Sequence, residues 1–182
     1  NSIFRLSCSI YKKIPDLVQL ANFTPKTVKS APCQEIILRG EQASLDILPI
    51  LKCWPLDGGR YFTFAGVYTK DIETGRRNVG MYRVQKLTAQ TCAMHWQVHH
   101  DGAAHCRGYE KQQQKMPIAL VLGGDPALSY AASAPLPPGM DEILFAGFLR
   151  QKPVELVKCL TIDMEVPAEA EIVIEGWADP AD

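Results

Sequence analysis

Two stretches on either side of one turn determine the fold class: residues 61–69, YFTFAGVYT, and residues 78–87, NVGMYRVQKL. Both are rich in aromatic and β-branched side chains, the residues that strands prefer. The segment between them ends in residues 73–77, ETGRR, whose glycine and charged side chains are typical of a turn. The pattern therefore predicts an antiparallel β-hairpin.

Further strand patterns lie on both sides of this hairpin. They are residues 35–40 (EIILRG), 44–54 (SLDILPILKCW), 91–97 (TCAMHWQ), 117–123 (PIALVLG), 154–160 (VELVKCL) and 171–177 (EIVIEGW). Helical patterns cover residues 103–114 and 140–150, while residues 122–128, LGGDPAL, have the glycines of a structural turn. Strands and helices do not alternate regularly and no GxGxxG motif is present, which excludes a Rossmann fold. We expect an α+β domain built on an antiparallel sheet or partly open barrel, with helices packed on it.

The first 34 residues differ from the rest, since they contain Pro15, Pro25 and Pro32 and no clear strand pattern. We interpret residues 1–34 as a leading helix and connector, and residues 35–182 as one domain. The chain starts without Met and without the basic, apolar and small-residue order of a signal peptide. We therefore expect the sequence to be part of a longer protein.

Composition argues against several classes of protein. With 19 basic and 20 acidic residues the net charge is −1, which gives nucleic acid no electrostatic reason to bind. No run of about 18 apolar residues is present, so we expect no membrane span. The six cysteines show no CxxC pair and no regular spacing, unlike a disulfide framework or a zinc ribbon. This usage fits a reducing compartment, and we expect a cytoplasmic protein.

All four histidines of the chain, His95, His99, His100 and His105, fall in one short stretch. Such clustering is typical of a ligand site, although histidines also gather on surfaces by chance. One interpretation is zinc bound by Cys92 and histidines of this stretch, but the spacing matches no known zinc finger. An oxygen-rich site for a harder cation is the favoured alternative.

Asn78, one of the histidines and a carboxylate such as Glu142 would suit Mn²⁺ or Mg²⁺ that bridges to a phosphate. Asn78 and Arg83 lie on one predicted strand, about 17 Å end to end, which matches the length of a flavin mononucleotide. On that picture Asn78 fixes the phosphate through the metal. Arg83 then lies near the flavin ring, where its planar fork of donors can bind a carboxylate substrate.

The alternative for Arg83 is an ordinary surface arginine on an exposed face of the sheet. Its neighbours Met81 and Tyr82, together with Trp96, are large and mostly apolar. Side chains of this kind favour a lined pocket over an exposed surface.

The motifs of the chain resemble, in the same order, those of the UbiD family of decarboxylases. The matching strings are APCQEIILRG, ILPILKCWPLDGGR, GRRNVGMYR, MHWQVHHDGA, LGGDPAL, APLPPGMDEILFAGFLR and VKCLTIDMEVPAEAEIVIEGW, which cover nearly all of residues 31–177. The resemblance implies a flavin-reductase-like antiparallel split β-barrel with packed helices, which binds prenylated FMN together with Mn²⁺ and K⁺. It also implies a UbiX-type flavin prenyltransferase as supplier of the cofactor, and assembly as a homo-oligomer.

The resemblance also implies roles for single residues. Asn78, His99 and Glu142 fall where the family keeps its metal ligands, and Arg83 matches its catalytic arginine, which polarises the bound acid. The residues at flavin-contact positions are Met81, Tyr82, Arg83, His95, Trp96 and Gln97. We assign His100 and Asp101 to the same contacts, although the family usually has a basic residue and then glycine there.

The implied reaction is the reversible non-oxidative decarboxylation of an aromatic or α,β-unsaturated carboxylic acid. The family's glutamates that complete a set with the arginine follow the EIVIEGW motif, and this sequence ends at Asp182. We therefore expect the chain alone to be inactive. Two alternatives stay open: a plain FMN-binding oxidoreductase that needs no metal, and a non-catalytic flavin-binding domain on the same fold.

Overall fold

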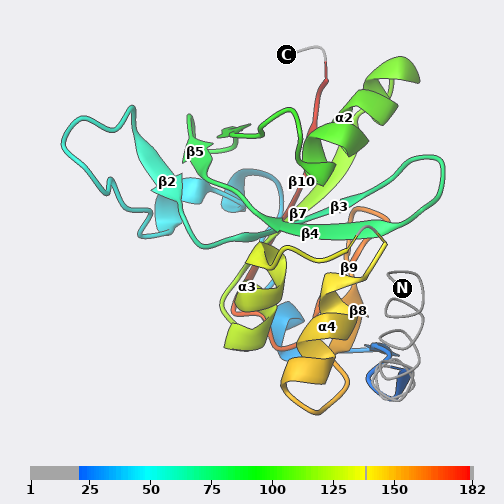
Figure 1. Cartoon of the computed structure of the whole chain (residues 1–182). Coiled ribbons are helices and arrows are strands. Elements are labelled where there is room, and N and C mark those ends of the chain that lie inside the picture. The colour runs from blue at the N-terminus through cyan, green and yellow to red at the C-terminus, as the bar shows by residue number, and fades with distance from the viewer. Residues whose placement is uncertain (1–20, 138, 181–182) are drawn as a thin grey trace.

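The computed structural model describes residues 21–137 and 139–180, and Figure 1 shows the arrangement of their helices and strands. The strands are β1 Lys26–Val28, β2 Arg60–Phe62, β3 Gly66–Lys70, β4 Arg77–Met81, β5 Val84–Lys86, β6 Cys92–Met94, β7 Met116–Leu122, β8 Glu155–Lys158, β9 Glu165–Pro167 and β10 Ile172–Ala178. The α-helices are α2 Asp101–Lys111, α3 Pro126–Ser133 and α4 Glu142–Leu149, and short 3₁₀ turns cover Pro32–Gln34, Gly40–Gln42 and Leu45–Ile47.

The central sheet has the strand order β10-β7-β3-β4, and every pairing in it is antiparallel. Strands β3 and β4 form the predicted hairpin, in a register that places Tyr68 opposite Val79 and Thr69 opposite Asn78. The order leaves β10 and β4 as the two outer strands of the sheet. The α+β class with antiparallel sheets is thereby confirmed.

A second sheet, β2-β5-β6, continues the same chain segments beyond two adjacent breaks. The central pairing ends at Gly66 and Met81, and the second begins at Phe62 and Val84. Residues 63–65 therefore oppose residues 82–83, and this unequal count bends the ladder as a β-bulge does. The prediction that Asn78 and Arg83 lie on one strand is wrong, because β4 ends between them.

The third sheet, β1-β8-β9, is mixed, since β1 runs parallel to β8 while β9 is antiparallel to it. Strand β1 precedes residue 35, so the sheets include part of the segment interpreted as a connector. Residues 1–20, where the leading helix was expected, lie outside the described residues. The described strands form three sheets and no closed barrel, and the split barrel stays a prediction.

Three local predictions differ from the structure. Residues 36–39 form no strand and residues 45–47 form a 3₁₀ turn, because these apolar runs line a groove instead of pairing in a sheet. In the predicted turn at residues 122–128, Asp125 caps a helix and Pro126 occupies its first turn, so α3 begins there.

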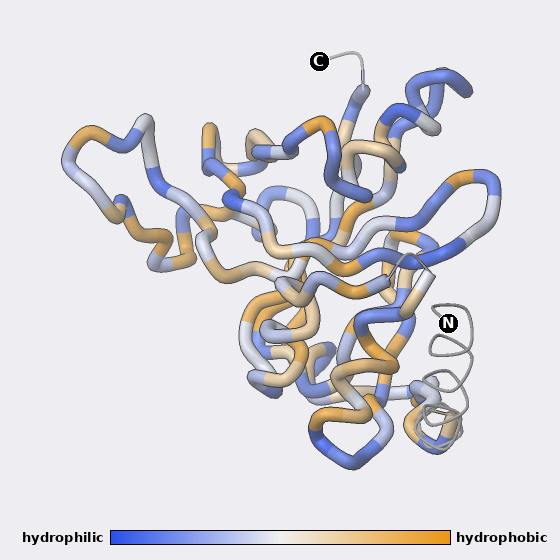
Figure 2. The backbone as a smooth tube through the Cα atoms, viewed as in Figure 1, coloured by the Kyte–Doolittle hydropathy of each residue, from blue (hydrophilic) through white to orange (hydrophobic). Residues whose placement is uncertain are grey.

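Two clusters of buried side chains cover the two faces of the central sheet. On one face Tyr68 and Val79 pack with residues of α3, α4 and the third sheet; on the other, Val67 and Tyr82 pack with Tyr109 of α2. Figure 1 shows α2 on one side of β4 and α3 with α4 on the other. In Figure 2, α4 is mostly hydrophobic, while the loop between β3 and β4 is mostly hydrophilic. In the described part of the chain no helix has the length and apolar character needed to cross a membrane.

Candidate functional site

Two helices begin beside the outer strand β4. Helix α2 starts at Asp101 after the N-cap His100, and α4 starts at Glu142 after the N-cap Asp141, whose carboxylate accepts from the first backbone N–H groups of that helix. The Val79 N–H donates to Glu142 Oε2 at 3.2 Å. Helix N-termini attract negative charge, and of these two only α2 lacks a side-chain cap, so the start of α2 is suited to an anionic group.

Glu142 and Asn78 bring oxygen atoms to this edge. Burial raises the pKa of the Glu142 carboxyl, and the nearby Asp101 carboxylate raises it further. Asn78 is only 8% exposed, and its Nδ2 has no hydrogen-bond partner among the described residues. Because an amide can turn by 180° and present its oxygen at the same place, Asn78 can serve as a donor or as a metal ligand.

Tyr82 lies at the centre of a polar and aromatic cluster. Its ring is 5.2 Å from that of His100 and 6.4 Å from that of Trp96, measured between centroids, and it covers Gly80. Burial raises the pKa of the Tyr82 hydroxyl. Trp96 Nε1 and His100 Nδ1 are also buried without a hydrogen-bond partner in the described part of the chain.

These unpartnered atoms indicate whether the residues around Tyr82 can bind a cofactor. Buried polar atoms in proteins are nearly always hydrogen-bonded, and exceptions call for a ligand, ion or water. Nitrogen donors beside two helix N-termini suit the phosphate and ring acceptors of a flavin, and the Glu142 carboxylate with the Asn78 amide suits Mn²⁺. The donor set therefore fits the implied groups.

Arg83 directly follows Tyr82 in the break between β4 and β5, and its side chain contacts residues of the second sheet and of the loop before it. Its Nη2 is 3.1 Å from Asp57 Oδ2, and its Cζ lies 4.0 Å from the centre of the Tyr61 ring. The side chain is 42% exposed, so donors of the guanidinium remain open to a ligand.

Other predicted residues are not gathered into the cluster. His99, His95 and Gln97 are exposed, and Met81 is half-buried. Residues 21–137 and 139–180 contain no group of three or more His, Cys, Asp or Glu side chains placed to hold a metal ion. Instead of completing a zinc site, His105 Nδ1 pairs with Thr69 Oγ1 at 2.9 Å.

Sequence reasoning missed two residues that contact Arg83, namely Asp57 and Tyr61. Asp57 precedes a Gly-Gly pair in a turn, and Tyr61 belongs to the strand that follows. An acidic residue fixed in a glycine turn directly before a strand was the available signal. The pairing itself depends on the β2–β5 register, which no local pattern states.

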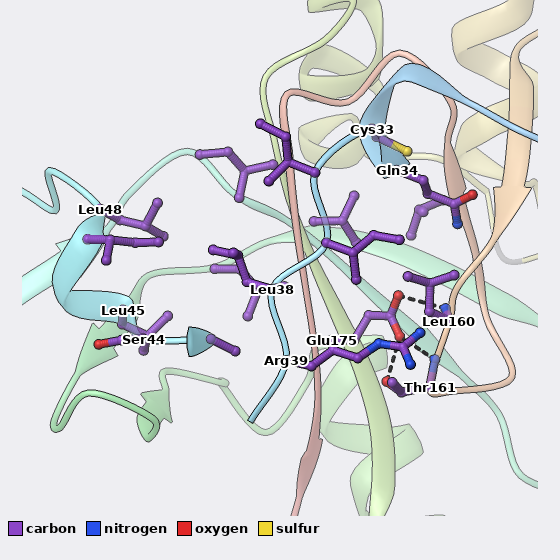
Figure 3. A pocket seen from close by; sticks show the side chains of 18 of the residues that line it. Cys33, Gln34, Leu38, Arg39, Ser44, Leu45, Leu48, Leu160, Thr161 and Glu175 are labelled. Carbon is purple, nitrogen blue, oxygen red and sulfur yellow. Dashed lines mark hydrogen bonds between the residues drawn. The ribbon is translucent and has the colours of Figure 1, made fainter. Parts of the chain in front are cut away.

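A groove lies elsewhere, along β10 at the opposite edge of the central sheet. It measures about 530 Å³, and none of the predicted site residues lines it. Figure 3 shows Leu38, Leu45 and Leu48 on its walls, with Glu175 bonded to the loop that contains Leu160 and Thr161. Its lining is mostly apolar and differs in kind from the β4 edge.

Comparison with known proteins identifies the family. Residues 26–182 match the model of the family described as UbiD, 3-octaprenyl-4-hydroxybenzoate carboxy-lyase Rift-related domain. The chain therefore belongs to the UbiD family, a family of decarboxylases, and the resemblance drawn from its motifs is confirmed. A protein of Aquifex aeolicus is 53% identical over 169 residues, which are 93% of this chain and 35% of that protein.

Solved structures of the same class have the same fold. Vanillic acid decarboxylase of Sedimentibacter hydroxybenzoicus, in its closed form, is 32% identical with a TM-score of 0.83, over 89% of this chain and 36% of that one. An evolved dimeric form of HmfF from Pelotomaculum thermopropionicum, in complex with prFMN, is 35% identical with a TM-score of 0.82. The match covers 88% of this chain and 38% of that one. HmfF is also known in complex with FMN. The chain thus spans about a third of the length of these relatives.

Proposed function

We propose that the chain is the cofactor-binding part of an enzyme that reversibly decarboxylates an aromatic or α,β-unsaturated carboxylic acid with prenylated FMN. The observation that carries the proposal is the group of buried, unpartnered polar atoms around Tyr82, placed where α2 and α4 begin. Family membership and the FMN and prFMN complexes of HmfF support the choice of cofactor. Bound in the site, the prenylated flavin supplies the electron sink that lets the carboxylate leave as CO₂.

In this proposal Asn78, His99 and Glu142 hold Mn²⁺ beside the cofactor phosphate, with K⁺ bound nearby. Val79 orients Glu142 by donating its backbone N–H, which leaves the other carboxylate oxygen for the metal. His99 is exposed and free to act as a ligand, and its assignment to the metal is supported by the family motif. The flavin then lies against Tyr82, Trp96 and the other residues assigned to it: Met81, Arg83, His95, Gln97, His100 and Asp101.

Arg83 binds the substrate carboxylate in the proposed reaction. Its guanidinium offers paired N–H donors in the geometry of a carboxylate, and its partly exposed position leaves room for the acid. The C–C bond to the carboxylate breaks, CO₂ leaves, and a proton from an acidic residue replaces it on carbon. Arg83 orients the carboxylate before the bond breaks and does not itself give up a proton.

The first test is native mass spectrometry with metal analysis on the full-length protein co-expressed with a UbiX-type flavin prenyltransferase, the proposed cofactor supplier. We expect a bound mass equal to prenylated FMN, together with manganese, in a cytoplasmic homo-oligomer. Plain FMN without metal would favour an FMN oxidoreductase, and no bound flavin would favour a non-catalytic domain. In either case the decarboxylase proposal is wrong.

Arg83→Ala separates binding from chemistry in the same protein. We expect the flavin absorption spectrum and the metal content to be retained while CO₂ release is lost, because the substrate carboxylate has no partner. Loss of the flavin would instead make Arg83 a structural residue. We also propose that the 182-residue chain alone has no turnover; CO₂ release by this chain with reconstituted cofactor would contradict that.

A further inference from the structure

The loop before β2 holds the acid that contacts Arg83. Asp57 Oδ2 accepts a hydrogen bond from the Trp54 N–H at 3.1 Å, and the Asp57 N–H donates to the Trp54 carbonyl at the same distance. The Asp57 side chain is only 13% exposed, against 42% for that of Arg83. The carboxylate is therefore fixed by its own turn, and the guanidinium is the member of the pair that adjusts to it.

Tyr61 fixes the same guanidinium from a second direction. The Arg83 Cζ atom lies 4.0 Å from the centre of the Tyr61 ring, within the range of a cation–π contact. Tyr61 belongs to β2, its N–H donates to the Leu51 carbonyl at 2.9 Å, and it pairs with Gln85 of β5. The ring thus has a defined place in the second sheet.

The two contacts leave part of the guanidinium free. Arginine has five N–H donors in one plane, of which the bond to Asp57 uses one. Arg83 has no other side-chain hydrogen bond to the described residues. A planar cation held along one edge and one face, with donors still open, is preorganised for an incoming carboxylate.

We propose that Asp57 and Tyr61 are positioning residues, which hold the Arg83 guanidinium in the orientation that binds the substrate carboxylate. The inference rests on the proposed function, because it requires that Arg83 binds the acid. Asp57 does more than orient Arg83, since its negative charge opposes a second carboxylate at the same site. Removing that charge should loosen the orientation of Arg83 and at the same time favour binding of the anionic substrate.

The test compares variants of the full-length, cofactor-loaded enzyme by steady-state decarboxylation. For Asp57→Asn we expect kcat to fall roughly 10- to 100-fold, because misplacement of a catalytic group costs rate. KM should stay unchanged or fall, since the site becomes more positive. For Tyr61→Leu we expect kcat to fall about 3- to 10-fold through loss of the cation–π contact. Flavin and metal content should equal those of the unaltered enzyme in both variants.

Asp163→Asn and Tyr130→Leu are matched controls. Asp163 pairs with Lys70 at 3.0 Å on the surface, and Tyr130 is an exposed tyrosine of α3. Both should leave kcat and KM unchanged. Wild-type kinetics in Asp57→Asn and Tyr61→Leu, with an inactive Arg83→Ala, would overturn this inference and leave the proposed function intact. Full turnover in Arg83→Ala would overturn the role of Arg83 and with it this inference, while the decarboxylase function would stand. Loss of flavin from Asp57→Asn would make Asp57 structural.

Discussion

The two outer strands of the central sheet, β4 and β10, face different chemistry. Beside β4, two helices begin, and buried nitrogen atoms have no hydrogen-bond partner among the described residues. Beside β10, the Glu175 carboxylate is satisfied by the Leu160 N–H, the Thr161 N–H and the Thr161 hydroxyl, at 2.5 to 2.8 Å. One sheet therefore separates an edge that still needs polar partners from an edge whose polar group is already bonded and whose groove is apolar.

Each edge also holds one ionisable side chain whose pKa is raised by burial, Glu142 at the β4 edge and Cys159 near β10. Burial raises the pKa of Glu142 at the β4 edge, so binding a cation there would recover the cost of ionising it. Near β10, burial raises the pKa of Cys159 to about 12 and keeps it an unreactive thiol. Burial alone therefore does not distinguish the two edges; the unpartnered nitrogen atoms that the described residues leave at the β4 edge do.

We expect the largest effect on metal content and activity from a comparison of two variants of the full-length protein, each of which removes one carboxylate charge at one edge of the central sheet. In Glu142→Gln the amide oxygen can still accept from Val79, but the metal loses an anionic ligand. We expect manganese to be lost and decarboxylation to fall by more than about 100-fold. Glu175→Gln should keep both, and metal analysis with CO₂ release checks the pair. Equal metal content in the two variants would remove the distinction between the edges.

His99 and His100 are neighbours in sequence but have different proposed roles at the β4 edge. The family motif assigns the metal to His99, whereas the structure packs His100 against Tyr82 and leaves His99 exposed. We expect His99→Ala to lower manganese affinity by about 10- to 100-fold with flavin contacts kept, and His100→Ala to weaken flavin retention more than metal binding. Metal titration of both variants is decisive. If only His100→Ala loses manganese, the ligand assignment moves to His100.

Two glycines provide a stability comparison of the same edges. A Cβ at Gly80 would overlap the ring and hydroxyl of Tyr82, whereas a Cβ at Gly176 in β10 meets nothing within 4 Å. Gly80→Ala should therefore cost about 1–3 kcal/mol of unfolding free energy. Gly176→Ala should be neutral or stabilise by up to about 1 kcal/mol, since alanine loses less backbone entropy in a strand. Urea unfolding of the purified chain measures both; a tolerated Gly80→Ala would mean that Tyr82 is not confined.

The smallest expected effect is a pH dependence on the α2 side of the sheet. Burial lowers the pKa of His105 below 6.5, its ordinary value, so the unfolded chain binds this proton more readily. The corresponding stability is present above pH 6.5 and is lost as pH falls toward the lowered pKa. In His105→Gln we expect a smaller drop in unfolding free energy between about pH 7.5 and about pH 5. An identical drop in both proteins would refute the assignment. Cys159, with a thiol protonated throughout this range, contributes none.

The sequence predicted elements whose formation is local. The β3–β4 hairpin and helix α4 follow from strand composition, a glycine turn and apolar spacing. Residues 35–40 and 44–54 were predicted as strands because they are apolar, but an apolar run does not show whether it pairs in a sheet or lines a groove. The helix signal at Asp125 and Pro126 was present and was outweighed by the two glycines before it.

For the candidate site, too, the sequence predicted individual residues but not the long-range contacts between them. Asn78 and Glu142 were chosen from donor chemistry and motif, and the structure places both at the β4 edge. The contact of Asp57 with Arg83 could not be predicted, because it spans 26 residues and depends on the pairing of β2 with β5. Long-range pairing of this kind is a property of the register and not of either segment.

The double break between β3–β4 and β2–β5 interrupts the ladder that joins the central sheet to the second sheet. Arg83 lies in this break, Tyr61 lies beyond it in the second sheet, and Asn78 lies before it in the central sheet. The separation of Arg83 from Asn78 is therefore set by how the two sheets join, and not by the regular rise of a single strand.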